Sequence, residues 1–256
     1  MKFAATFHDI AGKSVFISGG GSGIGEYLTE GFLAQGARVA FVQRSDATAL
    51  CDRLEKQYGA RPLFIPCDVT DIAALQAAIE QSAKAHGDVG VLVNNAAWDN
   101  RHTLDGLGVD QWDHMLNVNI RHHFFAIQAV APGMRKAGGG SIINYSSISY
   151  MMGGAGYPAY AAAKSGITGL TRGLARELGP DNIRVNALMP GWVLTERQRE
   201  LWADEASLKA HIDRQCLKVE IPPEAMVEPT LFLASAASTV MTGQALVVDA
   251  GVVVTG

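Results

Sequence analysis

The chain has 256 residues, of which 48% are hydrophobic and 18% are charged, and its formal net charge is −4. This composition suits one large globular domain and excludes a disordered chain. A small negative charge without a polybasic run gives no reason to expect a nucleic-acid partner. No apolar run reaches the roughly 20 residues that span a bilayer, and residues 1–12 lack a signal-peptide core, so no membrane partner is expected. The three cysteines form no C-x-x-C pair, which suits a reducing compartment and predicts a cytoplasmic protein.

Apolar runs typical of strands alternate along the chain with segments of helical periodicity. We expect strands at residues 14–18, 38–42, 63–66, 89–93, 141–145, 184–188 and 245–248. We expect helices at residues 25–35, 47–58, 72–86, 109–135, 158–178 and 223–235. Most of these strands are continuously apolar, as in parallel sheets that are covered on both faces. The pattern therefore predicts an α/β fold, a single Rossmann-type domain over residues 1–256 with a doubly wound parallel sheet of about seven strands and helices on both faces.

One segment departs from this alternation. Residues 195–223 are polar, contain Trp202 and follow the sixth predicted strand. Right-handed crossovers place the loops after parallel strands along one carboxyl edge of the sheet. Because active-site loops often cover a substrate there, we interpret residues 195–223 as a helical substrate lid. The alternative is an ordinary surface excursion.

A glycine-rich turn lies between the first predicted strand and the first predicted helix. Residues 18–25 read Ser-Gly-Gly-Gly-Ser-Gly-Ile-Gly. Glycines let the backbone approach a pyrophosphate closely, and a helix N-terminus supplies amide donors and positive potential. Strand, turn and helix in this order are typical of a dinucleotide site, whereas an isolated motif of this kind is equally an ordinary glycine turn.

Tyr160 and Lys164 give a second signal, together with Ser147 thirteen residues before the tyrosine. Residues four apart share one face of a helix. An ammonium group there lowers the pKa of a phenol and makes it a usable base, and the serine hydroxyl can orient a substrate oxygen. Ser146 and Ser149 compete for that serine role. Alone, the Tyr-x-x-x-Lys pair is equally a solvated helix face, but with the glycine-rich turn it favours a functional site.

These motifs resemble, in order and over nearly the whole chain, those of the short-chain dehydrogenase/reductase family. The turn resembles the family motif T-G-x-x-x-G-x-G, with Ser18 in place of threonine, and residues 94–97 resemble N-N-A-G, with Ala97 in place of the last glycine. The resemblance implies a catalytic tetrad of Asn119, Ser147, Tyr160 and Lys164. It also implies that the lysine bonds the nicotinamide ribose and that the asparagine holds a water that relays the proton to solvent.

The same resemblance implies the coenzyme-binding residues and an assembly. The coenzyme residues are Gly19, Ser22, Gly23, Ile24, Gln43, Arg44, Asp68, Val69, Asn95, Tyr160, Lys164, Pro190, Gly191, Val193 and Thr195. A homotetramer is implied as well, with interfaces formed by the helices at residues 109–135 and 158–178. The second of these helices carries small residues that permit close approach of a partner, namely Ala159, Ala161, Ala162, Gly166 and Gly169.

Coenzyme choice depends on the end of the second predicted strand. An acidic residue there would bond the adenosine ribose and repel a 2′-phosphate, but this chain has Gln43 followed by Arg44. Arginine offers charge-assisted donors to phosphate, although an arginine at a strand end is commonly just solvated. Ser22 is not basic, so one frequent second phosphate contact is absent. We therefore expect NADP as the coenzyme, with NAD accepted as well.

Four shorter segments resemble bacterial aldose and sugar-acid dehydrogenases, D-xylose dehydrogenases among them. They cover residues 99–102, 119–122, 195–198 and 215–218. The expected substrate residues are Trp98, Asp99, Asn100, Arg101, His102, Ser149, Trp192, Arg197 and Gln198. Polar groups beside two indoles suit a polyhydroxylated ring better than a steroid or an acyl chain, because each hydroxyl needs a partner. For the arginines, the alternative is a surface salt bridge.

We expect an NAD(P)-dependent enzyme that oxidises a sugar, most simply an aldose at C1 to its lactone, with Tyr160 as the general base. Its partner would then be a small-molecule sugar. One alternative is a dehydrogenase of a sugar acid, such as a keto-deoxy acid, in which Arg101, Arg121 or Arg197 would hold the carboxylate. Others are a polyol dehydrogenase and a keto reductase. A non-catalytic dinucleotide-binding sensor is an alternative of another class, which the intact tetrad argues against because a binder needs no base.

No metal site is expected. The seven histidines show no metal-ligand spacing. His122 and His123 are adjacent, and side chains of adjacent residues diverge by about 100° on a helix.

Overall fold

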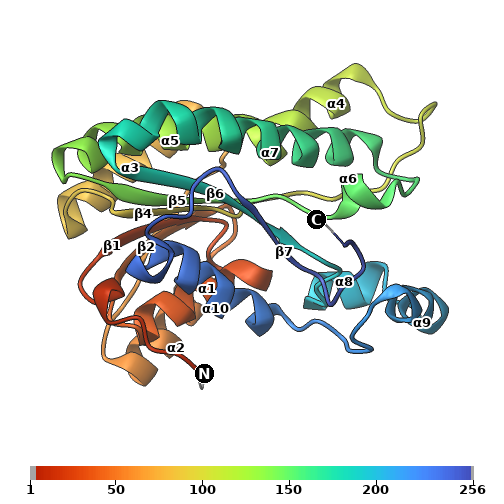
Figure 1. The fold of residues 1–256 in the computed structure, drawn as a ribbon, viewed down its shortest axis with the longest axis horizontal. Coiled ribbons are helices and arrows are strands. Elements are labelled where there is room, and N and C mark those ends of the chain that lie inside the picture. Colours follow the sequence, from red (N-terminus) through yellow and green to blue (C-terminus); the bar gives the residue numbers. More distant parts are fainter. Residues whose placement is uncertain (1–3, 255–256) are drawn as a thin grey trace.

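Seven parallel strands run through the middle of the fold. The computed structural model describes residues 4–254, and Figure 1 shows one twisted sheet with a layer of helices on each side. The strands are β1 (Ser14–Ser18), β2 (Arg38–Gln43), β3 (Leu63–Pro66), β4 (Val91–Asn94), β5 (Gly140–Tyr145), β6 (Ile183–Pro190) and β7 (Ala245–Val248). Their order is β3-β2-β1-β4-β5-β6-β7, and every neighbouring pair is parallel. The predicted fold class is therefore confirmed.

Helices cover both faces of the sheet because the strands are apolar on both faces. One layer holds α3 (Ile72–His86), α4 (Val109–Leu116), α5 (His122–Lys136) and α7 (Pro158–Leu178), and the other holds α1 (Gly23–Ala34), α2 (Thr48–Tyr58) and α10 (Val227–Ala234) (Figure 1). None of the helices in the described part of the chain combines enough length and hydrophobicity to cross a bilayer.

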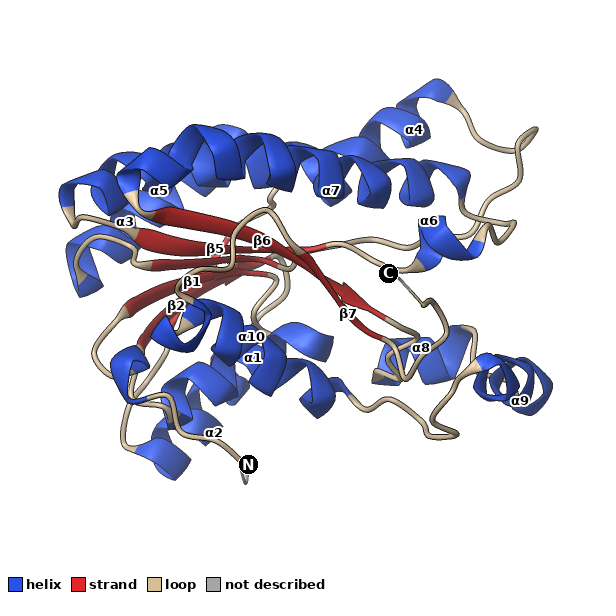
Figure 2. Ribbon diagram, viewed as in Figure 1, coloured by secondary structure: helices blue, strands red, loops and turns tan. Residues whose placement is uncertain are grey.

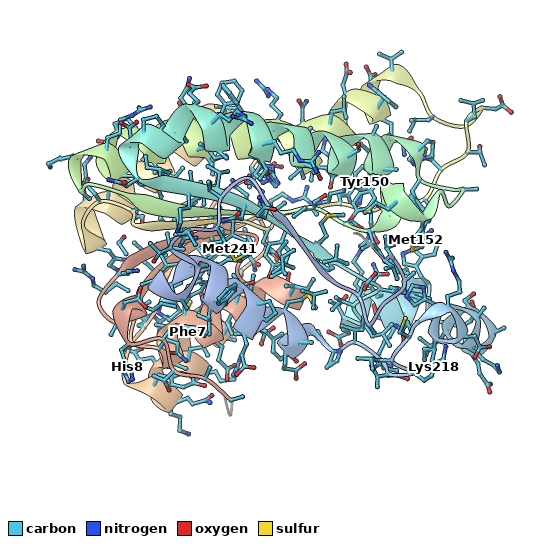
Figure 3. All side chains as sticks on the ribbon, in the orientation of Figure 1. Phe7, His8, Tyr150, Met152, Lys218 and Met241 are labelled. Atoms are coloured by element: carbon cyan, nitrogen blue, oxygen red, sulfur yellow. The ribbon has the colours of Figure 1, made fainter. Side chains whose placement is uncertain are left out.

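Strand β1 shows how one apolar run serves two cores. All five of its residues are buried. Val15 and Ile17 belong to the core beneath α1 and α10, whereas Phe16 belongs to the core on the other face, because successive side chains alternate across a strand. Burying a large apolar side chain of this kind stabilises the fold by about 1.5–3 kcal/mol. Figure 3 shows such side chains filling the space between the sheet and the helices.

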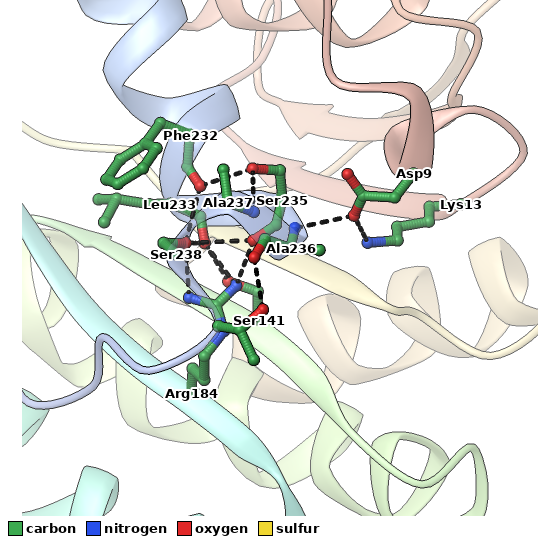
Figure 4. Close-up of polar contacts among 11 residues, drawn as sticks. Asp9, Lys13, Ser141, Arg184, Phe232, Leu233, Ser235, Ala236, Ala237 and Ser238 are labelled. Carbon is green, nitrogen blue, oxygen red and sulfur yellow. Dashed lines mark hydrogen bonds and ion pairs between the residues drawn. The ribbon is translucent and has the colours of Figure 1, made fainter.

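The C-terminal end of α10 is held to the sheet by Arg184 of β6 (Figure 4). A helix leaves its last carbonyls without intrahelical partners. The Arg184 guanidinium donates from Nη2 to the Leu233 and Ser235 carbonyls, at 2.8 and 3.1 Å. The Ser141 hydroxyl on β5 donates to the Leu233 carbonyl as well, at 2.8 Å. These bonds satisfy the helix end and fix α10 against the central strands.

Two predicted helices differ from the observed ones, and one short helix has no counterpart in the sequence pattern. Residues 109–135, expected as one helix, contain a π-helical turn, Asn117–Arg121, between α4 and α5. Such turns are rare, are frequent at functional sites and leave no mark in hydrophobic periodicity. Residues 223–235 begin as a 3-10 helix, Pro223–Met226. The unexpected α6 (Ser149–Met152) is too short to show a period.

Residues 195–223 leave the two layers and form α8 (Glu196–Leu201) and α9 (Glu205–Arg214). Figure 2 shows both helices near the end of β7, outside the layers. Thr195 and Asp204 cap their N-termini by accepting backbone N–H bonds from Gln198 at 3.3 Å and from Ser207 at 2.9 Å. The segment is helical as expected, and its role as a lid stays a prediction.

Candidate active site

A deep cleft opens at the carboxyl edge of the sheet. Its volume is about 1570 Å³, and loops after β1, β2, β4, β5 and β6 line it together with α8 and α9. Most of the predicted site residues line this cleft, although they are remote in sequence. Four of them do not: Gly23, Asn100, Asn119 and His102. Tyr157, which precedes α7 as its N-cap residue, lines it without having been predicted, and its place three residues before Tyr160 was an available signal.

The glycine-rich turn forms the wall next to α1. Gly19 has a φ of +69°, a conformation that glycine adopts without strain. A Cβ atom on Gly25 would lie 1.8 Å from the Gly19 carbonyl oxygen, and one on Gly21 would lie 2.3 Å from Gln43 Oε1. Because side chains are excluded there, the backbone and the N-terminus of the 12-residue α1 face the cleft directly. This bare turn fits the pyrophosphate of a dinucleotide.

Ser18 fixes the neighbouring loop, residues 94–97. Its hydroxyl oxygen accepts the N–H groups of Asn95 at 3.0 Å and Ala96 at 3.1 Å. In return, Asn95 Nδ2 donates to the carbonyls of Ser18 at 3.2 Å and Gly19 at 2.9 Å. Ser18 and Asn95 therefore hold the two loops together.

The end of β2 offers two groups that a coenzyme can engage. Gln43 Nε2 donates to the Ser45 carbonyl at 3.0 Å, while Gln43 Oε1 is buried with no hydrogen-bond partner among residues 4–254. Arg44 is 72% exposed, and its guanidinium lies 3.7 Å from the Asp68 carboxylate. Burial raises the pKa of Asp68, but hydrogen bonds from Thr70 and the charge of Arg44 lower it more, so the net pKa lies below its usual value.

Tyr160 and Ser147 meet in the cleft, where β5 ends and α7 begins. Both side chains line the cleft, and Ser147 is close enough to lower the pKa of Tyr160. The Ser147 hydroxyl oxygen accepts the Ser149 N–H at 3.1 Å, which fixes its position. The competing Ser146 is buried and donates to the Lys164 carbonyl at 2.7 Å. Ser147 is therefore the serine that faces the tyrosine.

Lys164 lies behind Tyr160 and is only 1% exposed. Its Nζ is 5.5 Å from the centre of the Tyr160 ring and donates to the Tyr145 carbonyl at 2.8 Å. Burial lowers the pKa of Lys164 to about 7, against an opposite contribution from Asp99. Burial also raises the pKa of Tyr160, Asp99 raises it further, and the hydrogen bond with Ser147 lowers it less. The expectation that the pKa of Tyr160 lies near neutrality is thus wrong for the protein alone, because desolvation dominates.

Asn119 lies in the π-helical turn and is fully buried. Its Oδ1 accepts the Trp98 N–H at 2.9 Å, and its Nδ2 donates to the carbonyls of Trp98 and Met115, each at 2.9 Å. The side-chain amide is therefore fully engaged in holding the loop after β4. These bonds fix the position of Trp98, and the water-holding role of Asn119 stays a prediction.

On the opposite wall, the loop after β4 contacts α8. Gln198 Nε2 donates to the Asp99 carboxylate at 2.6 Å, and Trp192 Nε1 donates to Gln198 Oε1 at 2.9 Å. Arg197 Nε lies 3.7 Å from Asp99. Four predicted substrate residues are thus brought together, and they hold α8 against the loop.

Two other predicted substrate residues have different surroundings. The guanidinium of Arg101 lies 4.6 Å from the ring centre of Tyr157 and 5.0 Å from that of Trp202, as a cation stacked on aromatic faces. His102 is buried, and its Nε2 accepts the Ala159 N–H at 3.2 Å at the start of α7. His102 therefore caps a helix N-terminus and does not contact the cleft, which corrects its assignment as a sugar ligand.

His122 and His123 are fully buried, and their ring centres lie 4.4 Å apart, so the expectation that they diverge is wrong. His122 Nε2 pairs with the Ser18 hydroxyl and His123 Nδ1 pairs with Asn144 Oδ1, both at 3.3 Å. Burial lowers the pKa of His122 to about 3 and that of His123 well below its usual value, so both rings are neutral. Among the described residues, no three His, Cys, Asp or Glu side chains gather as a metal site would require.

A parallel sheet with a dinucleotide-type turn, and a tyrosine with its serine and lysine in one cleft, define an oxidoreductase of carbinol or carbonyl groups. A family model described as "Enoyl-(Acyl carrier protein) reductase" matches residues 19–253. The chain belongs to the short-chain dehydrogenase/reductase family.

Relatives within this family include sugar dehydrogenases. "Probable galactose dehydrogenase GalD" of Rhizobium meliloti (strain 1021) is 49% identical over 97% of this chain and 98% of that protein. D-xylose 1-dehydrogenase of Caulobacter vibrioides (strain NA1000 / CB15N) is 44% identical over the same shares, 97% and 98%. The solved structure of L-sorbose reductase from Gluconobacter frateurii, complexed with NADPH and L-sorbose, matches with a TM-score of 0.88 and 29% identity over 96% of this chain and 99% of that chain. The predicted resemblance to sugar dehydrogenases is confirmed.

The first prediction concerns the base. Tyr160→Phe removes the hydroxyl and keeps the ring, so kcat for oxidation should fall by roughly 10²–10⁴-fold with little change in coenzyme affinity. Because burial and Asp99 raise the pKa of Tyr160, the wild-type hydroxyl is largely protonated at neutral pH. Oxidation should therefore rise as the pH becomes alkaline, and carbonyl reduction should fall. NAD(P)H absorbance against pH measures both, and near-normal activity of Tyr160→Phe at any pH would contradict the assignment.

Proposed function

We propose that the protein oxidises a neutral sugar with a nicotinamide dinucleotide, most simply an aldose at C1 to its lactone. The observation that carries the proposal is that the Ser147–Tyr160 pair and the polar Asp99–Gln198 pair line one cleft with the glycine-rich turn. The names of the galactose and D-xylose dehydrogenases support the substrate class. The NADPH complex of L-sorbose reductase supports the coenzyme class.

The roles of the chain's own residues follow from their contacts. A nicotinamide dinucleotide, when bound, supplies the acceptor for the hydride that leaves the carbinol carbon. Ser147 hydrogen-bonds the reacting oxygen and holds it beside Tyr160. Deprotonated Tyr160 takes the hydroxyl proton. Lys164 has a pKa lowered by burial to about 7, so it can take up and release protons near neutral pH. C1 of an aldose suits this site because its ring oxygen stabilises the developing carbonyl.

The arginines that would hold the carboxylate of a sugar acid are engaged elsewhere. Arg101 is stacked on two aromatic rings, and Arg197 lies beside the Asp99 carboxylate. Arg121 does not line the cleft, and its Nη1 donates to the Thr70 carbonyl at 3.4 Å. These contacts support a neutral sugar over the sugar-acid alternative.

For the coenzyme, we propose a preference for NADP with NAD also accepted. Gln43 stands where an acidic residue would repel a 2′-phosphate. Within residues 4–254, the exposed Arg44 is held only by a surface contact with Asp68, a kind of pair that is worth little in water. A 2′-phosphate can therefore compete for the guanidinium.

For the assembly, we propose a homotetramer in the cytoplasm. Trp112 and Phe124 are exposed apolar side chains on α4 and α5, and Gly169 on α7 has open space around it. Ala159 is buried and an added Cβ on Gly166 would lie 2.7 Å from Ile120, so these two serve packing within the chain and not an interface.

Three free cysteines support a reducing compartment. Light scattering and cell fractionation test the two statements, and an active monomer would contradict the first.

The second prediction concerns the coenzyme. Gln43→Asp combined with Arg44→Ile removes a phosphate donor and adds a repelling carboxylate. Loss of one charge-assisted bond should cost about 1.5–3 kcal/mol, or roughly ten- to a hundredfold in NADP affinity. The ratio of kcat/KM with NADP to that with NAD measures the change, and Arg44→Ile alone separates the two contributions. A wild type that ignores NADP would show that Arg44 is only a surface residue.

The third prediction concerns the substrate. In a panel of aldoses, sugar acids and polyols, we expect neutral aldoses to be oxidised and a lactone to form. Arg197→Gln should retain aldose oxidation, because no carboxylate clamp is lost. Absorbance of the reduced coenzyme and NMR of the product measure both. Activity confined to sugar acids, and lost on removing Arg101 or Arg197, would replace the neutral-sugar proposal with the carboxylate clamp.

A further inference from the structure

Three carboxylates of the described residues line the cleft, and they differ in the groups with which they interact. Asp68 lies at the end near Arg44 and accepts two hydrogen bonds from Thr70. Asp204 caps α9 through Ser207. Asp99 is the one whose charge acts on Tyr160 and Lys164, since it raises the pKa of both. It is therefore the carboxylate of the three that acts on the catalytic residues.

The contacts of Asp99 leave it capacity for a ligand. Gln198 donates one bond to Oδ2 at 2.6 Å, and Arg197 Nε lies 3.7 Å from Oδ1, beyond hydrogen-bond distance. An ionised carboxylate has about four acceptor sites. The Asp99 side chain is 25% exposed, whereas that of Arg197 is 52% exposed, so the cation is turned more to solvent than the anion. Hydroxyl groups entering the cleft would meet an acceptor with free lone pairs.

We propose that Asp99 determines specificity by accepting hydrogen bonds from the hydroxyls of a neutral sugar and by repelling a substrate that carries a carboxylate. This inference rests on the proposed function, since it requires a sugar to enter between the loop after β4 and α8. The cations near a second anion at Asp99 already have partners, because Arg101 is stacked on Tyr157 and Trp202 and Arg197 lies 3.7 Å from the Asp99 carboxylate. A neutral ring meets no such penalty.

The negative charge of Asp99 should also affect the pH at which Tyr160 acts as the base. Tyr160 is faced by Asp99 and Arg101 from the loop after β4 and by Tyr157 and Lys164 from its own helix. The other titratable groups lining the cleft are Arg44, Asp68, Cys67, His114, Tyr145, Arg197, Asp204, His211 and Arg214. Asp99 raises the pKa of Tyr160 and Arg101 lowers it. Removing the charge of Asp99 should therefore move the rise of oxidation with pH to lower pH.

The test compares Asp99→Asn with Asp105→Asn, which makes the same charge change at an exposed position on the same loop. The probes are D-galactose and D-galacturonate, which share a ring and differ in one carboxylate. In Asp99→Asn, the ratio of kcat/KM for galacturonate to that for galactose should rise roughly ten- to a hundredfold, and the pH profile should shift to lower pH. Asp105→Asn should behave as the wild type.

Arg197→Gln serves as a second variant if Asp99→Asn folds poorly. It leaves the Asp99 charge less compensated, so the ratio should fall and the profile should move to higher pH. An unchanged ratio and profile in both variants would overturn the inference, and so would a wild type that oxidises galacturonate as well as galactose. If the wild type oxidises only polyols, the proposed function fails, and the same variants still test Asp99 with a polyol and its aldonate.

Discussion

The burial of one lysine amino group is the constraint on which the catalytic arrangement depends. β5 ends at Tyr145, which supplies the carbonyl that accepts from Lys164, and Ser147 follows two residues later. α7 carries Tyr160 one turn before Lys164. The packing of α7 against the end of β5 therefore positions the serine, the tyrosine and the lysine together.

That burial also has a cost in stability. The pKa of Lys164 falls from 10.5 to about 7 because burial disfavours the ammonium. Between these two values the unfolded chain binds a proton that the folded chain has released, so this group makes folding stability rise with pH across that window. Below about pH 7 the whole cost is present. In return, the Lys164 amino group can take up and release protons near neutral pH.

Buried polar contacts connect the glycine-rich turn after β1 to the loop after β4. Ser18 bonds to the loop at residues 94–97 and pairs with His122, which follows the π-helical turn. Asn119 within that turn holds both backbone groups of Trp98. These groups are neutral and buried, so their bonds are strong and rigid. The contacts between Asp99 and α8 are more exposed, which suits a segment that must admit a substrate.

Much of the fold was predictable because it depends on local patterns. Continuous apolar runs identify buried parallel strands, and glycine spacing identifies the turn. The Tyr160–Lys164 spacing indicates a shared helix face, but it carries no information about burial, which reverses the expected direction of the Tyr160 pKa shift. The stacking of Arg101 on Trp202 joins residues a hundred positions apart, and no local pattern signals it.

The helix breaks and caps were less predictable for the same reason. The π-helical turn at Asn117–Arg121 lies between two α-helices, and the whole segment was predicted as one helix. The capping of α7 by His102 depends on how the loop after β4 folds back onto that helix. The neighbouring histidines, predicted to diverge, have rings in contact within the buried layer. Tertiary packing decides each of these features.

The most direct test of this account is the titration of Lys164 itself. NMR of the protein with ¹⁵N-labelled lysine side chains follows each Nζ with pH, and Lys164→Met identifies the signal. The account predicts one lysine that titrates near pH 7, well below the others. A Lys164 signal that titrates near the ordinary lysine value of about 10.4 would show that the amino group is solvated and would contradict the account.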